Sequence, residues 1–325
     1  MTFTPSDLSV KINDYLSSLK YTHEPVELYH PIEYTLNIGG KRVRPVLMLL
    51  AYNMYADNVE AILPQAAAIE IYHNYTLLHD DLMDKADMRR GKATVHKLWN
   101  DNAAILSGDA MLVLAYKYMS ECDSAKLKYI LDVFTKTALE ICEGQQWDVQ
   151  FENMNEVEID DYIEMIRLKT SVLLGAALKI GGIMAGASEE DIEKLYEFGI
   201  KIGLAFQLQD DYLDVYGNPK VFGKNIGGDI ISNKKTFMLL SALNDSNSVQ
   251  NEELRRWINS EECIPHEKIE AVTAIYNQLH IDQKCNCKIE QFFNEGLQIM
   301  DSLNVASDKK KELRNFVLHL MDRKL

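Results

Sequence analysis

The chain has 325 residues, of which 47% are hydrophobic and 26% are charged, a composition typical of a folded globular protein. Acidic residues outnumber basic residues by 49 to 34, and the formal charge of −15 argues against nucleic acid as a partner. The five cysteines form an odd set, so no disulfide framework is expected, and Cys285 and Cys287 are interpreted as ordinary thiols. No signal peptide or long uninterrupted apolar run is present, so we expect a cytoplasmic protein without stable membrane insertion.

Apolar residues recur at spacings of three and four along nearly the whole chain, which is typical of amphipathic helices. Polar or glycine-bearing breaks interrupt this pattern near residues 37–41, 56–60, 89–93, 153–158, 186–190, 217–233, 244–251 and 259–266. No proline occurs between positions 65 and 218, which favours long helices there, and Ser188 with Asp191 predicts a helix start. Convincing period-two strands are absent. We therefore expect one all-α domain over residues 1–325, built from about ten or more helices.

Clusters of basic residues form the first class of informative segments. The segment GGKRVRP at residues 39–45 places three cations after a glycine pair, and RRGK follows at residues 89–92. Further cations occur at residues 167–169, at Lys224 and at residues 234–235. Guanidinium and ammonium groups beside exposed backbone N–H groups suit phosphate, although each segment alone can equally be a basic surface turn.

Two acidic motifs of the form DDxxD form the second class, at residues 80–84 and 210–214. On a helix the first and last aspartates of each motif share a face, and like charges at that spacing destabilise a helix by a few tenths of a kcal/mol per pair. A bound cation is the expected compensation. Clustered carboxylates without His or Cys suit Mg²⁺, which takes one or two carboxylates and completes its shell with phosphate oxygens. For either motif alone, a solvated acidic helix face is the alternative.

Taken together, these motifs resemble the trans-type isoprenyl diphosphate synthases, the polyprenyl synthetase family, over roughly residues 38–240. The segments that carry the resemblance are, in order, Gly39–Pro45, Ile71-Tyr-His73, Leu78–Asp84, Arg89–Lys92, Ala104-Ile-Leu-Ser-Gly-Asp109, Lys169-Thr170 and Phe206–Asp214. The resemblance implies the isoprenoid synthase fold, in which helices surround a central cavity and the two aspartate motifs face each other across its mouth. It also implies a homodimer and about three Mg²⁺ ions per active site.

The resemblance implies a prenyltransferase that condenses isopentenyl diphosphate head-to-tail with an allylic diphosphate (dimethylallyl, geranyl or farnesyl) by ionisation, condensation and elimination. The implied site residues are Asp80, Asp84 and Asp210 as metal ligands; Asp81, Asp211 and Asp214 as the rest of the acidic walls; Lys41, Arg44, His73 and Arg90 for isopentenyl diphosphate; Arg89, Lys169, Lys224 and Lys234 for the allylic diphosphate; and Thr170 and Gln207 facing the allylic cation.

Two tyrosines before the first aspartate motif bear on product length. At about 1.5 Å of helix rise per residue, Tyr75 lies roughly 7 to 8 Å and Tyr72 roughly 12 Å before Asp80. In the resembled family, an aromatic residue at the position of Tyr75 marks all-trans products of about fifteen to twenty carbons, and we expect farnesyl or geranylgeranyl diphosphate, with farnesyl slightly ahead. The alternative is that both tyrosines only pack between helices. The first motif also lacks the two-residue insertion of typical bacterial farnesyl diphosphate synthases.

One local departure is Asn233, which stands where many family members have glycine before the lysine equivalent to Lys234. Three other functions stay open: a terpene cyclase, which would not require the cations of residues 39–45 and 89–90, a longer-chain polyprenyl diphosphate synthase, and a non-catalytic regulatory subunit. Regulatory subunits typically lose aspartates, whereas all six are present here. The allylic starter, the downstream pathway, the final proton acceptor and the role of the C-terminal third do not follow from the sequence.

Overall fold

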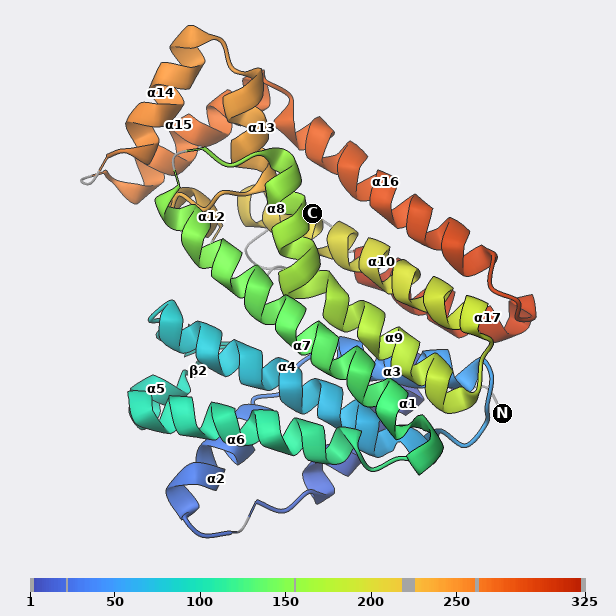
Figure 1. Ribbon diagram of the computed structural model, residues 1–325. Coiled ribbons are helices and arrows are strands. Elements are labelled where there is room, and N and C mark those ends of the chain that lie inside the picture. The colour runs from blue at the N-terminus through green and yellow to red at the C-terminus, as the bar shows by residue number, and fades with distance from the viewer. Residues whose placement is uncertain (1–2, 22, 155, 218–225, 261–262, 323–325) are drawn as a thin grey trace. The chain divides into compact units, whose positions relative to one another are not determined.

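The computed structural model describes residues 3–21, 23–154, 156–217, 226–260 and 263–322. Within these residues, regular structure is helical (Figure 1) except for a hairpin of two short antiparallel strands, β1 (Met88–Arg89) and β2 (Lys92–Ala93). The predicted all-α fold is therefore confirmed. The hairpin occupies one of the expected breaks in the apolar pattern, where the sequence showed no strand signal.

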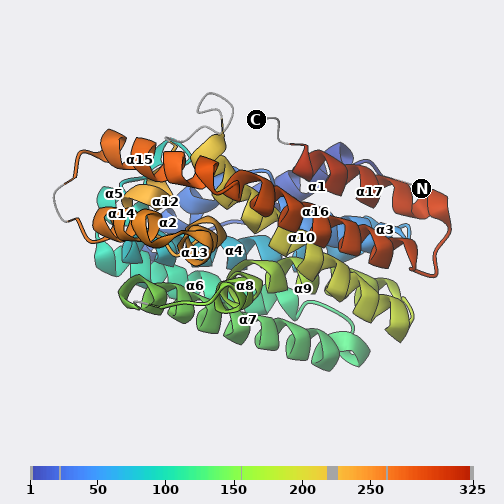
Figure 2. The same cartoon turned by 90° about the horizontal axis from the view of Figure 1, so that it is seen from above.

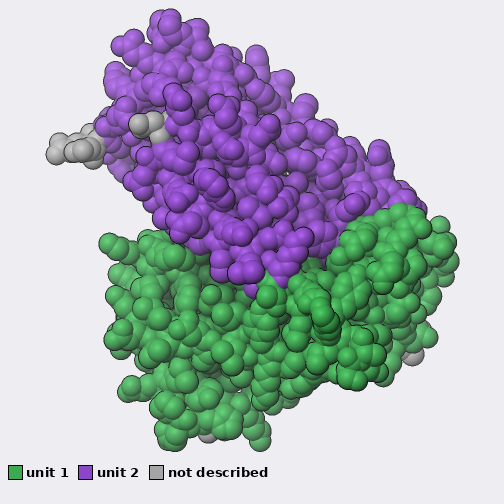
Figure 3. Space-filling view, in the orientation of Figure 1, with its two compact units in different colours: residues 1–135, 176–195, 304–313 green, residues 136–175, 196–303, 314–325 purple. Residues whose placement is uncertain are grey.

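The chain packs into two compact units, each assembled from segments far apart in the sequence (Figure 3). Unit 1 comprises residues 1–135, 176–195 and 304–313, and unit 2 comprises residues 136–175, 196–303 and 314–325. Among the described helices, four contribute residues to both units: α7 (Ser124–Asn153), α9 (Val172–Ala185), α10 (Glu189–Tyr216) and α17 (Ser307–Met321). The expected single domain over the whole chain stays a prediction.

Unit 1 holds the N-terminal helices and the first aspartate motif. Its remaining helices are α1 (Pro5–Ser18), α2 (Val26–Asn37), α3 (Val43–Asn53), η1 (Val59–Ile62), α4 (Leu63–Met83), α5 (Val95–Leu98) and α6 (Asp101–Met119). α4 packs along α6 (Figures 1 and 2), and a Cβ atom on Gly108 of α6 would lie 2.2 Å from Nε2 of His79. This close packing fixes the end of α4 that carries the motif.

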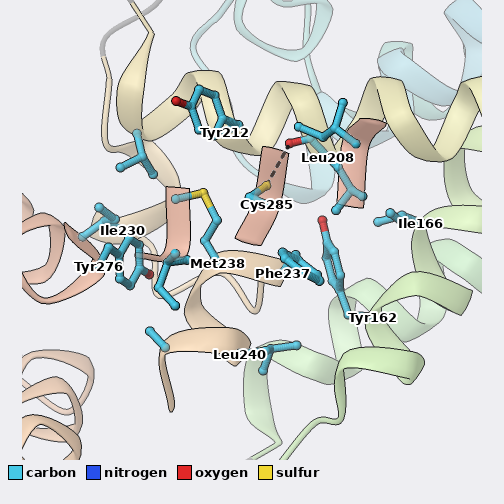
Figure 4. Packing of buried hydrophobic residues seen from close by; sticks show 14 of the residues in the cluster. Tyr162, Ile166, Leu208, Tyr212, Ile230, Phe237, Met238, Leu240, Tyr276 and Cys285 are labelled. Atoms are coloured by element: carbon cyan, nitrogen blue, oxygen red, sulfur yellow. Dashed lines mark hydrogen bonds between the residues drawn. The ribbon is translucent and has the colours of Figure 1, made fainter. Parts of the chain in front are cut away.

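Unit 2 holds the second aspartate motif and the C-terminal helices. Its remaining elements are α8 (Ile159–Ile166), the π-helical turn η2 (Arg167–Ser171), α12 (Gly228–Ile231), α13 (Phe237–Asp245), α14 (Ser248–Ile258), α15 (Pro265–Gln278) and α16 (Ile281–Asp301). A buried apolar cluster joins these helices to α10 (Figure 4). In it, the Cys285 thiol lies 3.8 Å from the backbone oxygen of Leu208, which anchors the middle of α10.

The start of α10 follows the predicted capping residue. Ser188 Oγ accepts a hydrogen bond from the backbone N–H of Asp191 at 3.2 Å, and the helix begins at Glu189. The carboxylate of Asp191 does not return to the cap, because it accepts from the backbone N–H of Asn304 at 2.9 Å. The predicted helix start is correct, and the second half of the capping pair instead fastens α10 to the segment before α17.

The stretch Ile159–Ala185, which runs through α8, η2 and α9, is long and apolar enough to cross a membrane. In the structure, 72% of its most apolar window is buried. Buried apolar helices of soluble protein cores pass the same test of length and composition, so the stretch is weak evidence for a membrane span.

Candidate active site

The first aspartate motif forms the C-terminal end of α4. Asp80 and Asp81 lie in the last turn, and Asp84 caps the helix, with its N–H donating to the backbone oxygen of Asp80 at 2.8 Å. The helix ends there, and Lys85 adopts a left-handed conformation with φ of 52°. Carboxylates at this end oppose the helix dipole, whose C-terminus is negative. Their placement adds to their mutual repulsion and favours a bound cation.

Asp81 and Arg89 form a bidentate ion pair. Arg89 Nη2 lies 2.6 Å from Asp81 Oδ1, and Arg89 Nε donates to both carboxylate oxygens at 2.8 and 3.0 Å. Asp81 is buried, whereas Arg89 is partly exposed. The β1–β2 hairpin presents Arg89, because Arg90 and Gly91 both have positive φ, the conformation of a tight two-residue hairpin turn. The structure thus brings together two residues that the sequence assigned to different groups.

Arg90 reaches back to the glycine pair of the GGKRVRP segment. Its guanidinium donates to the backbone oxygen of Gly39, and a Cβ atom on Gly40 would lie 2.6 Å from Arg90 Nη1. Gly40 also has φ of 145°, a conformation that residues with a side chain rarely adopt. Burial lowers the pKa of Arg90 from its ordinary value, and the nearby Arg42 contributes. The glycine pair therefore serves the close approach of a guanidinium.

Arg42, the middle cation of GGKRVRP, is turned into the core. Its guanidinium pairs with Glu70 at 2.7 Å and also donates to Asn13 Oδ1 at 3.0 Å and to the backbone oxygen of Leu36 at 2.8 Å. Arg42 is 6% exposed and Glu70 is 2% exposed. This network joins α1, α2, α3 and α4, so Arg42 fixes the segment between α2 and α3. By contrast, Lys41 is exposed and Arg44 is half-buried.

Arg44 contacts His73, as the shared assignment of the two residues anticipates. Arg44 Nη1 lies 3.0 Å from His73 Nε2. Burial, and then the guanidinium groups of Arg44 and Arg90, hold the pKa of His73 well below its ordinary value. His73 is therefore neutral at pH 7, and its Nε2 accepts the hydrogen bond from Arg44. The result is a group of guanidiniums around an uncharged imidazole, which suits a multiply charged anion.

Tyr72 and Tyr75 belong to an aromatic cluster that extends beyond α4. Their ring centroids are 5.4 Å apart, Tyr75 lies 4.8 Å from the ring of His79, and Tyr72 lies 5.3 Å from Phe134 of α7. Phe134 in turn contacts Tyr116 of α6 at 4.9 Å. Tyr72 is fully buried, whereas Tyr75 is half-buried. The cluster is compatible with both readings of the tyrosines, as a cavity floor and as interhelical packing.

The second aspartate motif lies near the C-terminal end of α10, in unit 2, so it too opposes a helix dipole. Asp211 is buried, accepts from the hydroxyl of Tyr162, and accepts from Gln207 Nε2 at 3.1 Å. Burial, and then the nearby Asp229, raise the pKa of Asp211 to about 8. Thr170 completes the chain by donating to Gln207 Oε1 at 3.2 Å. Three expected site residues are thus joined, and Tyr162 is an addition that the sequence did not indicate.

Asp210 and Asp214 are half-buried members of the same motif. Asp214 Oδ2 accepts from the backbone N–H of Asp229 at 2.9 Å, and its backbone oxygen accepts from Gly227 at 2.5 Å. Asp214 therefore anchors the segment that leads into α12. The expected facing of the two aspartate motifs across a cavity stays a prediction.

Lys169 and Thr170 lie on η2, the wide π-helical turn between α8 and α9. Such turns are rare and occur frequently at functional sites. Gly144 of α7 lies directly against this turn, since a Cβ atom there would be 2.3 Å from the backbone nitrogen of Lys169. On the α10 side, a Cβ atom on Gly203 would be 2.6 Å from Cα of Ser171. Two glycines therefore allow the turn to pack between α7 and α10.

Asp148 of α7 joins two of the expected diphosphate-binding lysines. Its Oδ2 atom lies 2.7 Å from Lys169 Nζ and 3.9 Å from Lys234 Nζ. Burial would raise the pKa of Asp148, but Lys234 and Lys169 outweigh burial and lower that pKa. Asp148 was not among the residues predicted from the sequence. The available signal was Gly144, because a glycine within a helical pattern indicates close packing. Lys224 lies outside the described residues.

The carboxylates of the two aspartate motifs suit Mg²⁺, which takes part of its coordination from water and substrate. They suit less well a metal that is coordinated by protein side chains alone. Among the described residues, no three His, Cys, Asp or Glu side chains converge as a metal site. Mg²⁺ commonly takes one or two carboxylates and obtains its other oxygens from water and substrate phosphate. Carboxylates at the negative ends of two helices, with Arg and Lys nearby, match that requirement.

Comparisons with known proteins identify the family. The model of the polyprenyl synthetase family matches residues 25–279. The chain belongs to the polyprenyl synthetase family. A short chain isoprenyl diphosphate synthase of Methanocaldococcus jannaschii is 43% identical over 234 residues, which cover 72% of this chain and 71% of that protein. A (2E,6E)-farnesyl diphosphate synthase of Mycobacterium bovis is 31% identical over 290 residues, which cover 88% of this chain and 80% of that protein.

The fold agrees with this membership. The crystal structure of a geranylgeranyl pyrophosphate synthase superposes with a TM-score of 0.94 at 44% identity, covering 99% of this chain and 100% of that one. The family resemblance inferred from the motifs is therefore confirmed, and it extends beyond the segment of residues 38–240 that carried it.

Proposed function

We propose that this polyprenyl synthetase family member is a Mg²⁺-dependent prenyltransferase that condenses isopentenyl diphosphate head-to-tail with an allylic diphosphate. The observation that carries the proposal is the pair of aspartate motifs at helix C-termini, accompanied in each unit by cations suited to diphosphate. Relatives named as short-chain isoprenyl, geranylgeranyl and farnesyl diphosphate synthases support the reaction class. A cytoplasmic location and a homodimer are part of the proposal.

Isopentenyl diphosphate is assigned to the cations of unit 1. Lys41, Arg44 and Arg90 would bind its diphosphate, and neutral His73 would orient Arg44 through the 3.0 Å contact. Arg90 is held against the glycine pair, so its position is set before substrate arrives. The cost of ordering a long side chain is therefore met during folding rather than during binding.

The allylic diphosphate is assigned to Lys169, Lys224 and Lys234, with Arg89 from the hairpin. Asp148 orients Lys169 through an ion pair of 2.7 Å. Asp80, Asp84 and Asp210 would hold Mg²⁺, which when bound supplies electrophilic stabilisation of the diphosphate leaving group. Asp81, paired with Arg89, and Asp211, buried against Tyr162, are assigned to positioning within the two acidic walls.

Ionisation of the allylic carbon–oxygen bond leaves a carbocation beside the departing diphosphate, and the lysines stabilise the negative charge that gathers there. The Thr170 hydroxyl donates to Gln207 Oε1, and the remaining oxygen lone pairs of these two side chains can face the cation. The isopentenyl double bond then attacks the cation, and loss of a proton completes the product. We propose a product of about fifteen to twenty carbons, because Tyr75 and Tyr72 are bulky side chains one and two turns before the first motif.

The experiment is to incubate the purified protein with isopentenyl diphosphate, Mg²⁺ and each of three starters, and to identify products by mass. We expect farnesyl or geranylgeranyl diphosphate. Asp80→Ala and Asp210→Ala should each lower turnover by a factor of about 100 or more while the fold is kept, because each loses a metal ligand and a charge repulsion. Wild-type turnover by either variant at saturating Mg²⁺ would refute the ligand assignment.

Two other results of the same experiment would overturn the proposal. Condensation with no starter would favour the regulatory subunit, and a cyclised product formed without isopentenyl diphosphate would favour a terpene cyclase. Products much longer than about twenty carbons would keep the reaction class and replace the assigned chain length.

A further inference from the structure

The backbone around Lys234 has a conformation that few residues accept. α12 ends at Ile231, and Asn233 then adopts φ of 57°, in the left-handed region. The next residue returns to α12, because the N–H of Lys234 donates to the backbone oxygen of Asp229 at 2.9 Å. After glycine, asparagine is among the residues that adopt this conformation most readily. Asn233 therefore satisfies the backbone and, unlike glycine, also supplies a side chain.

Both the nitrogen and the oxygen of the Asn233 side-chain amide form hydrogen bonds. Asn233 Nδ2 donates to the backbone oxygen of Ile258, the last residue of α14, at 2.9 Å. Asn233 Oδ1 accepts from Lys268 Nζ of α15 at 2.6 Å. One amide thus ties the turn after α12 to two other helices of unit 2.

Lys268 is an unusual partner, because it is 2% exposed. Besides Asn233, its ammonium donates to the backbone oxygen of Ile231 at 3.3 Å. Among the described residues, no carboxylate forms an ion pair with it, and burial lowers its pKa. A buried charge held only by neutral oxygens is costly for stability. A role in function accounts for such a residue better than a role in stability.

The turn that these hydrogen bonds hold leads directly to Lys234, a residue of the proposed site. Lys234 directly follows Asn233, its Nζ lies 3.9 Å from Asp148 Oδ2, and its charge acts on Asp211. Asp229, Asn233, Lys234 and Lys268 also line one small pocket of unit 2. A shift of the Asn233 backbone would therefore move the ammonium of Lys234 relative to the second aspartate motif.

We propose that Asn233 and Lys268 are positioning residues, which hold the backbone of Lys234 so that its ammonium is aligned for the allylic diphosphate before substrate binds. The inference rests on the proposed function. In this chain, two hydrogen bonds of the Asn233 side chain hold the turn that leads to Lys234.

The test compares Asn233→Gly and Lys268→Met in the full chain. Asn233→Gly keeps the positive φ and removes both side-chain bonds, and Lys268→Met keeps the length of the side chain and removes the ammonium. Each should raise the KM for the allylic diphosphate by roughly tenfold and leave the KM for isopentenyl diphosphate unchanged. The double variant should be no worse than either single variant, because the two residues act as one unit.

Two matched controls come from the same unit. His280→Gly replaces another left-handed residue, with φ of 53°, and Lys284→Met removes a lysine that pairs with Asp245 at the surface. Both controls should keep both KM values. A lower melting temperature with unchanged KM values in Asn233→Gly and Lys268→Met would overturn the inference, because it would show a structural role only.

A second measurement separates this inference from the proposed function. Hydrogen exchange of the peptide that covers residues 226–236 needs no substrate, and it should become faster in both variants and stay unchanged in both controls. Unchanged exchange in this peptide would overturn the inference even in an active enzyme. Faster exchange in a protein that condenses no starter would refute the proposed function and leave the two hydrogen bonds supported.

Discussion

Lys41, Arg42 and Arg44 are close in the sequence but have different environments. Arg42 is buried against Glu70, Lys41 is exposed, and Arg44 contacts His73. Removing one partner of a buried ion pair typically costs about 3–5 kcal/mol, so we expect the charge of Arg42 to serve folding rather than substrate binding. Substitution of the three residues should therefore separate stability from substrate binding.

We expect Lys41→Ala and Arg44→Ala to raise the KM for isopentenyl diphosphate by about tenfold or more, with a much smaller effect on the allylic substrate. Each variant removes a charge-assisted contact to one diphosphate only. Steady-state kinetics with each substrate varied in turn checks the prediction, and Lys128→Ala, which removes an exposed lysine, is the control. Equal effects on both substrates would contradict the assignment of two sites.

His73 should make stability depend on pH on the acid side of neutrality. Its pKa in the folded protein lies well below the unfolded value of about 6.5, so the unfolded chain binds the extra proton first. The corresponding stability is present above about pH 6.5 and is lost as the pH falls toward the folded pKa. In urea titrations from pH 7.5 to pH 5, about the range in question, the midpoint should fall more for the wild type than for His73→Gln. Parallel pH profiles would show that His73 is not buried as a neutral group.

For individual residues, the sequence allowed predictions only for those that belong to motifs. It gave no prediction for residues that contact the motif residues from other helices. Asp80, Lys169 and Gln207 were assigned because the motifs that contain them resemble those of a known family. Asp148 and Tyr162 were missed, because their partners are 21 and 49 residues away and only the packing of helices brings them together.

Helix η2 depends on the absence of a side chain on the facing helix. We expect Gly144→Ala to destabilise the protein by about 3 kcal/mol and to lower kcat, since its Cβ atom would meet the backbone of Lys169 at 2.3 Å. Gly186→Ala is the control, because no atom lies within 4 Å of its added Cβ, and the positive φ of 76° is its main cost. Thermal melts and turnover measure both effects. Full activity of Gly144→Ala would show that the turn does not set the position of Lys169.

On α4, product length is the property that the aromatic residues should control. We expect Tyr75→Ala to lengthen the product by at least one isoprene unit, and Tyr72→Ala combined with it to lengthen the product further. Because Phe134 packs against Tyr72 at 5.3 Å, part of the space freed in the double variant stays blocked. Mass spectrometry of the products measures the chain length and so checks this prediction. The same product distribution in the double variant would place the cavity floor on another helix.

Helix boundaries were predicted correctly at residues 153–158 and 244–251, where polar residues interrupt the apolar pattern without glycine or proline, but a shorter polar stretch was missed. The break between α6 and α7 falls at residues 120–123 and contains neither. Asp123 caps the start of α7, because its Oδ1 accepts from the backbone N–H of Ala125 at 2.8 Å. A short polar side chain that binds the backbone competes with helix continuation. A single aspartate is a weak signal of a helix boundary when no glycine or proline lies nearby.

At the scale of the molecule, the exposed apolar face of α6 bears on assembly. Leu106 is 58% exposed and Val113 is 67% exposed, and at seven residues apart they share one face of the helix. We expect the wild type to sediment as a homodimer and Leu106→Glu with Val113→Glu to shift toward the monomer. Val249→Glu, at a residue of α14 that is 72% exposed, is the control. A wild-type monomer, or a double variant that still dimerises, would remove α6 from the interface.

The all-α class followed from apolar spacing alone, whereas the division into two units did not. Each unit combines three separate segments of the chain, and four of the described helices have residues in both. Periodicity reports which face of a helix is buried but not against which other helix, so the sequence had no information on this division.

The π-helical turn sets the angular phase between α8 and α9. At about 100° per residue, Tyr162 and Ser171 would lie about 180° apart on an uninterrupted α-helix, and the extra residue of a π turn reduces this to about 80°. Both residues contact α10, Tyr162 through Asp211 and Ser171 through Gly203. If Arg167–Ser171 formed a regular α-helix with all of its residues kept, Tyr162 would rotate by about 100° away from its partner on α10. The wide turn, rather than a regular α-helix, therefore lets both residues face α10.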